Sequence, residues 1–283
     1  MVVDGKGRIG GGDVAIPGDI SSQFVSALLL VAPLADRAVS MKLTTPLESK
    51  PYVSMTMEAQ RRFGVEVQAS CDMREFQVRK QTYHPTEFAI EGDWSSAAYM
   101  LAAGALAGKV TVLGLNPESL QADSAIIGIL KRMGGDMDIK GNAISVQSSS
   151  LNGLEFDMSD CSDLFPLVSA ICAAADGTSV LSGIRRLQYK ESDRVMAMVE
   201  GLREMGVKAT RSEDSVTIVG TNPRGGLIDP KRDHRIAMAF SIVGLVAEGN
   251  TVIQDSECVS KSYPGFWDDL EALGAGIGRI GNE

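Results

Sequence analysis

Cysteine and histidine are scarce in this chain of 283 residues. The four cysteines are scattered without a CxxC pair, and only two histidines accompany them, so the sequence supports neither a zinc site nor a disulfide framework. We therefore expect no bound metal and four reduced thiols. The four are Cys71, Cys161, Cys172 and Cys258.

Long apolar runs and an excess of positive charge are also missing. Apolar segments such as 27–32 are too short to span a bilayer, and the first residues lack the basic and apolar regions of a signal peptide. We expect a cytoplasmic protein without a membrane segment. The net charge of −9 argues against nonspecific binding to nucleic acid or acidic membranes, although a local basic cleft can still bind small anions.

The chain does contain an internal repeat of about seventy residues. Each copy has a polar turn, an apolar helix, a strand, an amphipathic helix that ends at a glycine, and further strands. The terminal glycines, at positions 64, 134, 206 and 274, lie 70, 72 and 68 residues apart. With 44% hydrophobic and 22% charged residues, the chain is globular rather than disordered. We expect an α/β fold of repeated βαβαββ units.

The first helix of each copy is apolar around its whole circumference, which is typical of a helix buried on every side. These expected core helices span 24–32, 97–107, 164–175 and 236–247. The second helices, such as 193–205, alternate apolar and charged positions and end at a glycine that can adopt the left-handed conformation. Short β-type runs supply the sheets, including 110–113, 143–146, 216–219 and 251–253.

Five short motifs resemble the EPSP synthase family of enolpyruvyl transferases. In chain order they are Gly18-Asp19-Ile20-Ser21-Ser22-Gln23-Phe24, Ser49-Lys50-Pro51-Tyr52, Lys190-Glu191-Ser192-Asp193-Arg194, Asp233-His234-Arg235-Ile236-Ala237-Met238 and Ser260-Lys261-Ser262-Tyr263-Pro264. Any one of them is weak evidence, but five in the family's order are specific. The resemblance implies two domains of three βαβαββ units each, arranged around buried parallel helices as an inside-out α/β barrel.

The match begins about a third of the way along the family's sequence, so we expect four of the six units. Residues 1–91 would form an incomplete first domain with one full unit, and residues 92–283 a nearly complete second domain with three. An exposed apolar flank on the incomplete domain would favour self-association or binding to a partner chain.

The resemblance implies transfer of the enolpyruvyl group from phosphoenolpyruvate to shikimate 3-phosphate, with release of phosphate and without a cofactor. The expected mechanism is addition followed by elimination. Both substrates are small polyanions, and most motif residues fall near predicted helix N-termini, where unpaired N–H groups and the helix dipole favour anions.

Contacts with shikimate 3-phosphate are implied for eight residues. They are Ser21, Ser22, Gln23, Ser49, Tyr52, Asp163, Arg186 and Lys190. Helix capping is the alternative for Ser21 or Ser22, and capping or packing for Ser49 and Tyr52. Arg186 stands where the family commonly has a substrate-contacting asparagine.

Contacts with phosphoenolpyruvate are implied for Gln23, Arg194, Arg235 and Lys261. Two guanidinium groups can grip a carboxylate or phosphate through paired hydrogen bonds. Because an arginine near a helix start is unfavourable with the dipole, a bound anion explains Arg235 better than local stability does. A simple salt bridge to a neighbouring acid is the alternative for Arg194.

Catalytic roles are implied for Asp163, Glu191, Lys261 and His234. Asp163 resembles the acid that handles the proton of the attacking hydroxyl, and a carboxylate beside a bound phosphate can have a raised pKa. Helix capping is the alternative for Asp163, and 164–166 depart from the small-residue pair usual after this acid. Glu191 resembles a second carboxyl group at the reacting carbon, with Lys261 and His234 near it for proton delivery.

Two alternative functions share these features. One is a noncatalytic or partner-dependent segment that binds shikimate 3-phosphate, and the other is a UDP-N-acetylglucosamine enolpyruvyl transferase, which shares the fold and the donor. The shikimate interpretation predicts that five distant side chains converge on one solvent-accessible hollow. They are Asp163, Glu191, Arg194, Arg235 and Lys261.

Overall fold

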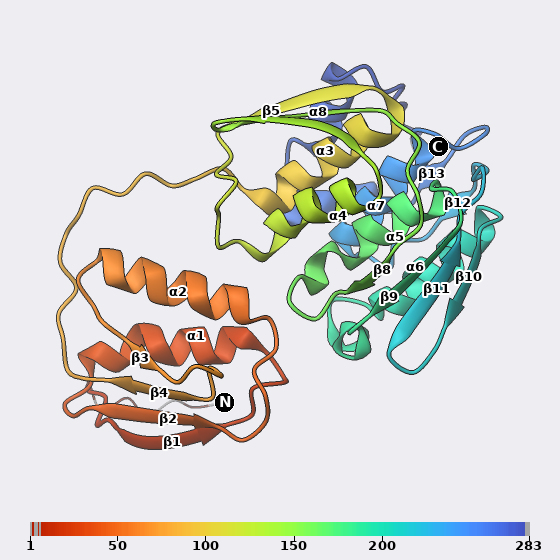
Figure 1. The fold of residues 1–283 in the computed structure, drawn as a ribbon. Coiled ribbons are helices and arrows are strands. Elements are labelled where there is room, and N and C mark those ends of the chain that lie inside the picture. Colours follow the sequence, from red (N-terminus) through yellow and green to blue (C-terminus); the bar gives the residue numbers. More distant parts are fainter. Residues whose placement is uncertain (1, 3–4, 6, 281–283) are drawn as a thin grey trace. The chain divides into compact units, whose positions relative to one another are not determined.

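The structure is a computed structural model that describes residues 2, 5 and 7–280 (Figure 1). The chain divides into two compact units. Unit 1 comprises Met1–Ile90 and Leu120–Ala122, and unit 2 comprises Glu91–Ser119 and Asp123–Glu283. In the described part of the chain, no helix combines the length and apolar character needed to cross a membrane. All four cysteines are free.

Unit 1 is one mixed sheet with two helices. Its elements are β1 (Gly12–Ile16), α1 (Ser22–Val31), η1 (Ala32–Leu34), β2 (Val39–Leu43), α2 (Lys50–Arg62), β3 (Gln68–Ala69) and β4 (Glu75–Val78). The strand order is β1-β2-β4-β3; β1 and β2 are parallel and the other pairs are antiparallel. Its core joins Val25 and Leu29 of α1 with Met41 and Phe76 of the sheet and Val53 of α2.

Unit 2 holds six helices and nine strands within the described residues. Its helices are α3 (Trp94–Ala107), α4 (Ile126–Arg132), α5 (Phe165–Ala173), α6 (Arg194–Glu204), α7 (His234–Gly244) and α8 (Phe266–Ala272). Its strands are β5 (Lys109–Leu113), β6 (Asp136–Lys140), β7 (Ala143–Gln147), β8 (Glu155–Asp157), β9 (Thr178–Ser182), β10 (Lys208–Arg211), β11 (Ser215–Val219), β12 (Leu227–Ile228) and β13 (Val252–Ile253). Short 3-10 turns precede several helices: η2 (Ala122–Ala125), η3 (Ser162–Leu164), η4 (Arg185–Tyr189) and η5 (Ser256–Lys261).

The sheets of the two units share one topology. In β8-β9-β11-β10, as in the sheet of unit 1, a parallel pair is followed by two antiparallel strands. The other two sheets of unit 2 each show one part of this topology. The three strands of β5-β7-β6 are antiparallel, and the two strands of β12-β13 are parallel. The mixed α/β fold class predicted from the sequence is confirmed.

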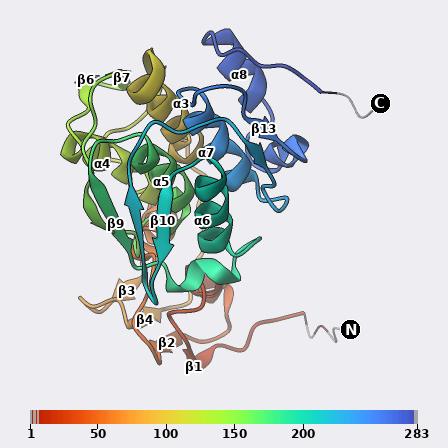
Figure 2. The same ribbon diagram turned by 90° about the vertical axis from the view of Figure 1, so that its right-hand side faces the viewer.

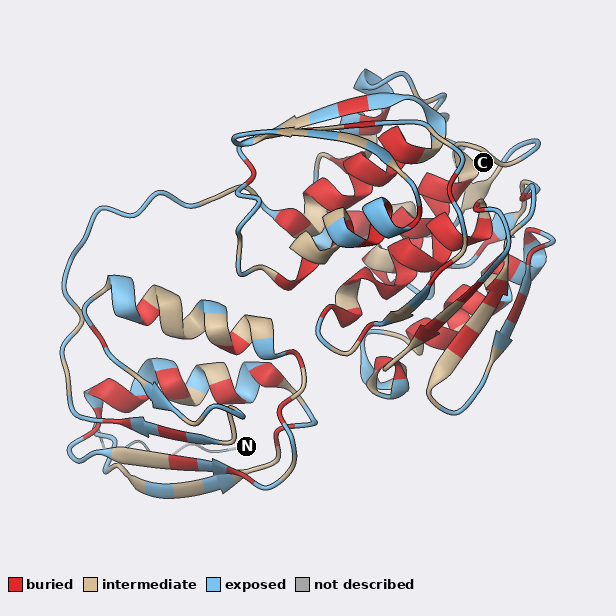
Figure 3. Cartoon of the chain, in the orientation of Figure 1, coloured by how far each residue is buried: buried red, intermediate tan, exposed pale blue. Residues whose placement is uncertain are grey.

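The core of unit 2 is formed by α3, α5 and α7, which pack against one another (Figure 1, Figure 2). Every residue in 97–105, 165–173 and 236–243 is buried (Figure 3). The prediction of helices buried on all sides is therefore confirmed in these three segments. Because a side chain on any face of such a helix meets protein, an apolar residue is favoured at every position.

The same prediction is wrong for 24–32. Helix α1 buries Val25 and Leu29, but Phe24 is 55% exposed and Leu30 46% exposed. In unit 1 this helix packs against α2 and one sheet face, so only the stripe that faces them is covered. The apolar residues on its other side face solvent.

The second helices end as the sequence predicts. The glycines that follow them, Gly64, Gly134, Gly206 and Gly274, have φ values of 81°, 88°, 78° and 100°. Lacking a Cβ, glycine adopts this left-handed conformation without steric cost and lets the chain turn toward the next strand.

Candidate active site

Charged residues gather at the N-terminal ends of α5, α6 and α7 in unit 2. Asp163 lies in the 3-10 turn before α5, and Arg194 is the first residue of α6. Asp233 precedes α7 and caps it by accepting a hydrogen bond from the Arg235 amide at 3.0 Å. Because the dipoles of these helices favour negative charge at their starts, carboxylates are well placed here and cations need partners.

Arg194 is the centre of this cluster. It is 1% exposed, and its guanidinium donates to Asp163 Oδ1 at 2.8 Å, to Glu191 Oε2 at 2.7 Å and to Asp233 Oδ2 at 2.8 Å. A buried guanidinium is tolerated when such ion pairs satisfy it. The alternative interpretation of Arg194, a salt bridge to a neighbouring acid, therefore describes this structure, in which Arg194 forms three such ion pairs.

Three further cations lie around this centre. Lys190 Nζ is 3.3 Å from Asp163 Oδ1, and Arg235 Nη2 is 3.3 Å from Asp163 Oδ2. Lys261 Nζ lies 2.8 Å from Glu191 Oε1, and its side chain is 57% exposed. The cluster therefore runs from a buried arginine to a solvent-exposed lysine.

The cations lower the pKa of both predicted catalytic carboxyl groups. Burial acts to raise the pKa of Asp163, but Arg235, Lys190 and Arg194 outweigh it and hold this pKa well below its ordinary value. The pKa of Glu191 falls to about 2, because Lys261 and Arg194 outweigh the effect of burial. Asp163 is therefore ionised here, and the raised pKa expected beside a bound phosphate stays a prediction.

His234 and Arg186 lie at the same helix starts. His234 begins α7, is 4% exposed, and has its pKa lowered by burial and then by Arg235, so the imidazole is neutral at pH 7. Arg186 Nη2 donates to Ser159 O at 3.1 Å and to Ser162 Oγ at 2.9 Å, next to the turn that carries Asp163.

The other predicted residues belong to unit 1, at the starts of α1 and α2. Ser21 caps α1 by accepting a hydrogen bond from the Gln23 amide at 3.2 Å, as the alternative for this serine predicted, and Ser22 is buried. Ser49 immediately precedes α2 in a left-handed conformation (φ 52°), and its side chain does not cap the helix. Tyr52 is half-buried in the first turn of α2.

The predicted residues thus form two groups. The structure brings together Asp163, Arg186, Lys190, Glu191, Arg194, His234, Arg235 and Lys261 in unit 2. In unit 1 the turns before α1 and α2 are adjacent, because the Glu48 amide donates to Gly18 O at 3.2 Å. These turns and the first turns of the helices that follow them carry Ser21, Ser22, Gln23, Ser49 and Tyr52.

A sequence profile of EPSP synthase (3-phosphoshikimate 1-carboxyvinyltransferase) matches residues 2–270. The chain belongs to the EPSP synthase family. A 3-phosphoshikimate 1-carboxyvinyltransferase of Dehalococcoides mccartyi is 42% identical over 264 residues, which are 93% of this chain and 63% of that protein. One from Halobacterium salinarum is 43% identical over 286 residues, 97% of this chain and 65% of the relative.

The solved structures agree with this family. EPSP synthase from Acinetobacter baumannii superposes with a TM-score of 0.78 at 28% identity, covering 95% of this chain and 63% of that one. The chain therefore spans a little under two thirds of the length of the EPSP synthases it matches.

One acid of this family member escaped sequence reasoning. Asp123 lies in the turn before α4 and is 2% exposed, with Oδ2 at 3.5 Å from Arg235 Nη1. It belongs to none of the five family motifs. Its position in the repeat could have indicated it. Asp123 lies in the turn before a second helix, and the corresponding turns before α2 and α6 carry the predicted residues Ser49 and Glu191.

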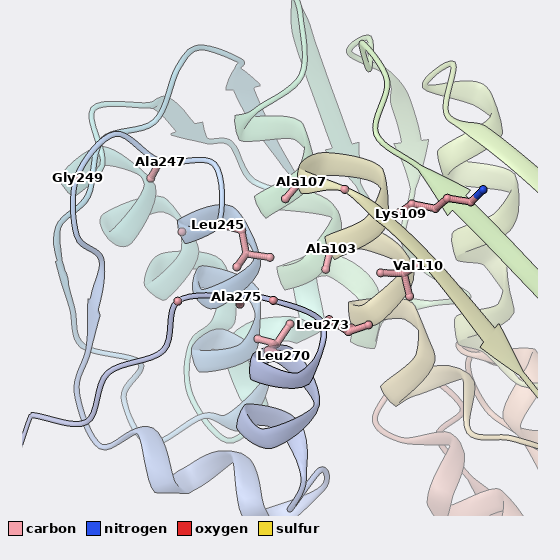
Figure 4. A pocket seen from close by; sticks show the side chains of 14 residues that line it. Ala103, Ala107, Lys109, Val110, Leu245, Ala247, Gly249, Leu270, Leu273 and Ala275 are labelled. Carbon is pink, nitrogen blue, oxygen red and sulfur yellow. The ribbon is translucent and has the colours of Figure 1, made fainter.

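A cavity of about 410 Å³ lies elsewhere in unit 2 (Figure 4). It is lined by the C-terminal ends of α3 and α7 and by residues around the end of α8, including Ala107, Leu245 and Leu273. The charged cluster lies at the N-terminal ends of α5, α6 and α7, whereas α7 contributes its C-terminal end to the cavity, so this cavity is not the candidate site. Within the described residues, no three or more His, Cys, Asp or Glu side chains are arranged to hold a metal ion.

Proposed function

We propose that this chain takes part in the transfer of the enolpyruvyl group from phosphoenolpyruvate to shikimate 3-phosphate, with release of phosphate. The observation that supports this most is the cluster around the buried Arg194, where four cations meet the carboxyl groups of Asp163 and Glu191. Relatives that carry the name 3-phosphoshikimate 1-carboxyvinyltransferase match nearly the whole chain.

Phosphoenolpyruvate is proposed to bind to Arg235 and Lys261, with Arg194 behind them, and Gln23 is also proposed as one of its contacts. The Lys261 side chain is exposed and the Arg235 side chain is 13% exposed, so a ligand from solvent can reach these two before it reaches the buried Arg194. Arg194 already donates to three carboxylates, so it acts on the ligand mainly through the positive charge that it adds. Fixed positive charge stabilises the tetrahedral intermediate and the departing phosphate.

Asp163 is proposed as the acceptor of the proton from the attacking hydroxyl. Its low pKa keeps it ionised, but also makes it a weak base. An arriving polyanion would offset the positive charge of Lys190 and Arg235, which raises the pKa of Asp163 and strengthens it as a base. Substrate binding and activation of the base are then one event.

Lys261 is proposed to deliver the proton to the methylene carbon of phosphoenolpyruvate, with Glu191 as the second carboxyl group at that carbon. Lys261 Nζ donates to Glu191 Oε1 at 2.8 Å, so the ionised carboxylate holds the ammonium group that carries the proton. His234 is proposed to assist from the start of α7, as a neutral imidazole. Addition of the hydroxyl at C2 and loss of phosphate complete the reaction.

Eight side chains are proposed as contacts for shikimate 3-phosphate. In unit 2 these are Asp163, Arg186 and Lys190. In unit 1 they are Ser21, Ser22, Gln23, Ser49 and Tyr52. We propose residues 1–91 and 92–283 as the two domains that supply them. The buried Ser22 and Ser49, at the starts of two helices, support an anion-binding role for those turns.

A phosphate-release assay with both substrates, run beside calorimetric titration of each substrate, tests the proposal. We expect both substrates to bind, and Asp163→Asn to abolish phosphate release while phosphoenolpyruvate still binds. UDP-N-acetylglucosamine in place of shikimate 3-phosphate is the control and should give no release. If neither shikimate substrate binds, the proposed function is wrong.

Binding without release would favour the alternative of a noncatalytic or partner-dependent binding segment. The chain spans 63% of the length of a related 3-phosphoshikimate 1-carboxyvinyltransferase, which is the reason to test this alternative. Adding the matching remainder of a relative as a separate polypeptide then separates the two possibilities, because restored release indicates dependence on a partner chain.

We further propose self-association through the exposed apolar side of α1. Phe24 (55% exposed), Leu30 (46%) and Val31 (39%) of α1 support it, together with Ile20 (61%) just before the helix, since exposed apolar side chains favour protein contacts. Light scattering should give a mass above 30.0 kDa that Phe24→Ser reduces. A monomer that is unchanged by this substitution would contradict the proposal.

A cytoplasmic location is also proposed, because free thiols suit a reducing compartment.

A further inference from the structure

We propose that Asp123 is a positioning residue that holds the Arg235 guanidinium in place while the Asp163 carboxylate turns to the substrate. The inference rests on the proposed function, because it takes Arg235 as a contact for phosphoenolpyruvate and Asp163 as the acceptor of the hydroxyl proton.

Asp123 is fixed and buried. Its exposure is 2%, its Oδ2 accepts a hydrogen bond from Ser95 Oγ at 2.7 Å, and the same oxygen lies 3.5 Å from Arg235 Nη1. Its Oδ1 is buried without a hydrogen-bond partner. Burial raises the pKa of Asp123, and the positive charge of Arg235 acts against this rise and favours the ionised carboxylate. The two groups therefore depend on each other.

Asp163 is held in a different way. Its side chain is 20% exposed and is shared among Lys190 at 3.3 Å, Arg194 at 2.8 Å and Arg235 at 3.3 Å. A base that accepts a proton from the substrate has to give up part of these contacts. Asp163 is thus the exchangeable partner of Arg235, and Asp123 is the permanent one.

Arg235 needs a permanent partner because of its place in the fold. It is the second residue of α7, where the positive end of the helix dipole repels a guanidinium. If the Asp163 carboxylate turned away, Arg235 would keep its hydrogen bond to the main-chain oxygen of Asp163 at 3.3 Å, but it would lose the charge of that carboxylate. Asp123 approaches from the turn before α4 and supplies a second negative charge that stays in place.

The position of Asp123 in unit 2 supports the same role. The corresponding turns before α6 and α8 carry Glu191 and Lys261, which pair with each other across 70 residues of sequence. The turn before α4 carries Asp123, which pairs with Arg235. Each of these turns therefore supplies one charged side chain to the same cluster.

Calorimetry on five versions of the chain tests the proposal: unaltered, Asp123→Asn, Arg235→Gln, the double variant of these two, and Asp93→Asn. Asparagine retains an oxygen that can accept from Ser95 but removes the charge. We expect Asp123→Asn to weaken phosphoenolpyruvate binding about tenfold and to leave shikimate 3-phosphate binding unchanged. Because Asp123 acts through Arg235, adding Asp123→Asn to Arg235→Gln should cause no further loss.

Asp93→Asn is the matched control. Asp93 caps α3 by accepting from the Ser95 and Ser96 amides, and asparagine caps a helix equally well. It should leave both affinities unchanged. Circular dichroism tests whether each variant is folded. A further variant, Ser95→Ala, removes the hydrogen bond to Asp123 but retains the charge of Asp123. It should weaken phosphoenolpyruvate binding by about threefold.

The outcomes separate the two hypotheses. No phosphoenolpyruvate binding by the unaltered chain overturns the proposed function and this inference with it. Equal binding by the unaltered chain and Asp123→Asn overturns the inference alone, as does equal loss of both substrates, which indicates a merely structural role. If Asp123→Asn does not fold, unchanged phosphoenolpyruvate binding by Ser95→Ala overturns the inference.

Discussion

Helices α1 and α5 have similar sequences and different surroundings. Both are almost entirely apolar and both begin near a phenylalanine, Phe24 in α1 and Phe165 in α5. Phe24 is 55% exposed, whereas Phe165 is fully buried. Helix α5 contacts three helices, α3, α6 and α7, and two strands, whereas α1 packs in unit 1 against one helix and one sheet face. An apolar helix is thus buried only as far as its neighbours reach.

The charged groups show the same contrast. In unit 1, Glu58 pairs with Arg61 and Arg62 on the exposed face of α2, all within four residues of sequence. In unit 2, the buried Arg194 pairs with Asp163 and Asp233, which lie more than thirty residues away. Desolvation makes the second kind of pair costly to break and the first nearly neutral.

The largest effect is expected from the matched phenylalanines. Phe165→Ala should lower the free energy of unfolding of unit 2 by about 4 kcal/mol, because it leaves a cavity in the core. Urea unfolding followed by tryptophan fluorescence measures this, since both tryptophans, Trp94 and Trp267, belong to unit 2. Phe24→Ala should change the stability of unit 1 by no more than about 0.5 kcal/mol, measured by circular dichroism. Equal losses would contradict the comparison.

A loss of about 3 kcal/mol is expected from Arg194→Met, because it leaves three carboxylates clustered without their central cation. The same urea titration measures it. The matched surface change is Arg61→Ala in unit 1, whose effect should be too small to resolve, since that side chain is 61% exposed. Unchanged stability of Arg194→Met would show that the buried pairs are not needed.

Acid should destabilise unit 2 through the same cluster. The pKa of Glu191 is about 2 in the folded chain against an ordinary 4.5, and that of Asp163 is also lowered. The unfolded chain therefore takes up protons first, so this stability is complete above pH 4.5 and is lost as the pH falls from 4.5 toward 2. Urea midpoints measured between pH 7 and pH 3 test this.

The control for the acid effect is Glu191→Gln, which should flatten the fall in stability below pH 4.5. Glu58 in unit 1 has a pKa of about 2 as well, lowered by Arg61 and Arg62, but this pair is exposed. Added salt should therefore weaken the contribution of Glu58 more than that of the buried Asp163. A salt effect of equal size on both units would argue against the buried cluster.

The smallest effects are expected at the glycines that end the second helices. Gly206→Ala should cost about 1 kcal/mol, because the left-handed conformation strains any residue with a Cβ. Gly64→Ala should cost more, because its Cβ would come within 2.7 Å of the His84 ring. The additional His84→Ala change should recover the difference, and thermal unfolding measures all three variants. No recovery would show that the contact is not the cause.

Much of the fold could be predicted from local pattern. The glycines 64, 134, 206 and 274 mark helix ends wherever they occur, and the runs 110–113 and 143–146 lie in paired strands. Of the eight predicted side chains that lie near one another in unit 2, six belong to the family motifs, and Asp163 and Arg186 came from the wider resemblance to the family. Asp123 escaped because its role depends on contact with Arg235, 112 positions away, and not on a neighbouring motif.

The amino-acid sequence by itself determined the features that depend on near neighbours: helix starts capped by Ser21 and Asp233, helix ends at glycine, and the alternation of apolar residues in strands. Tertiary structure alone decided which apolar helices are fully enclosed and which carboxyl groups have a lowered pKa. The reason is physical, since burial and Coulomb energy depend on distances through space, and the partners of Asp163 and Arg194 lie far away along the chain.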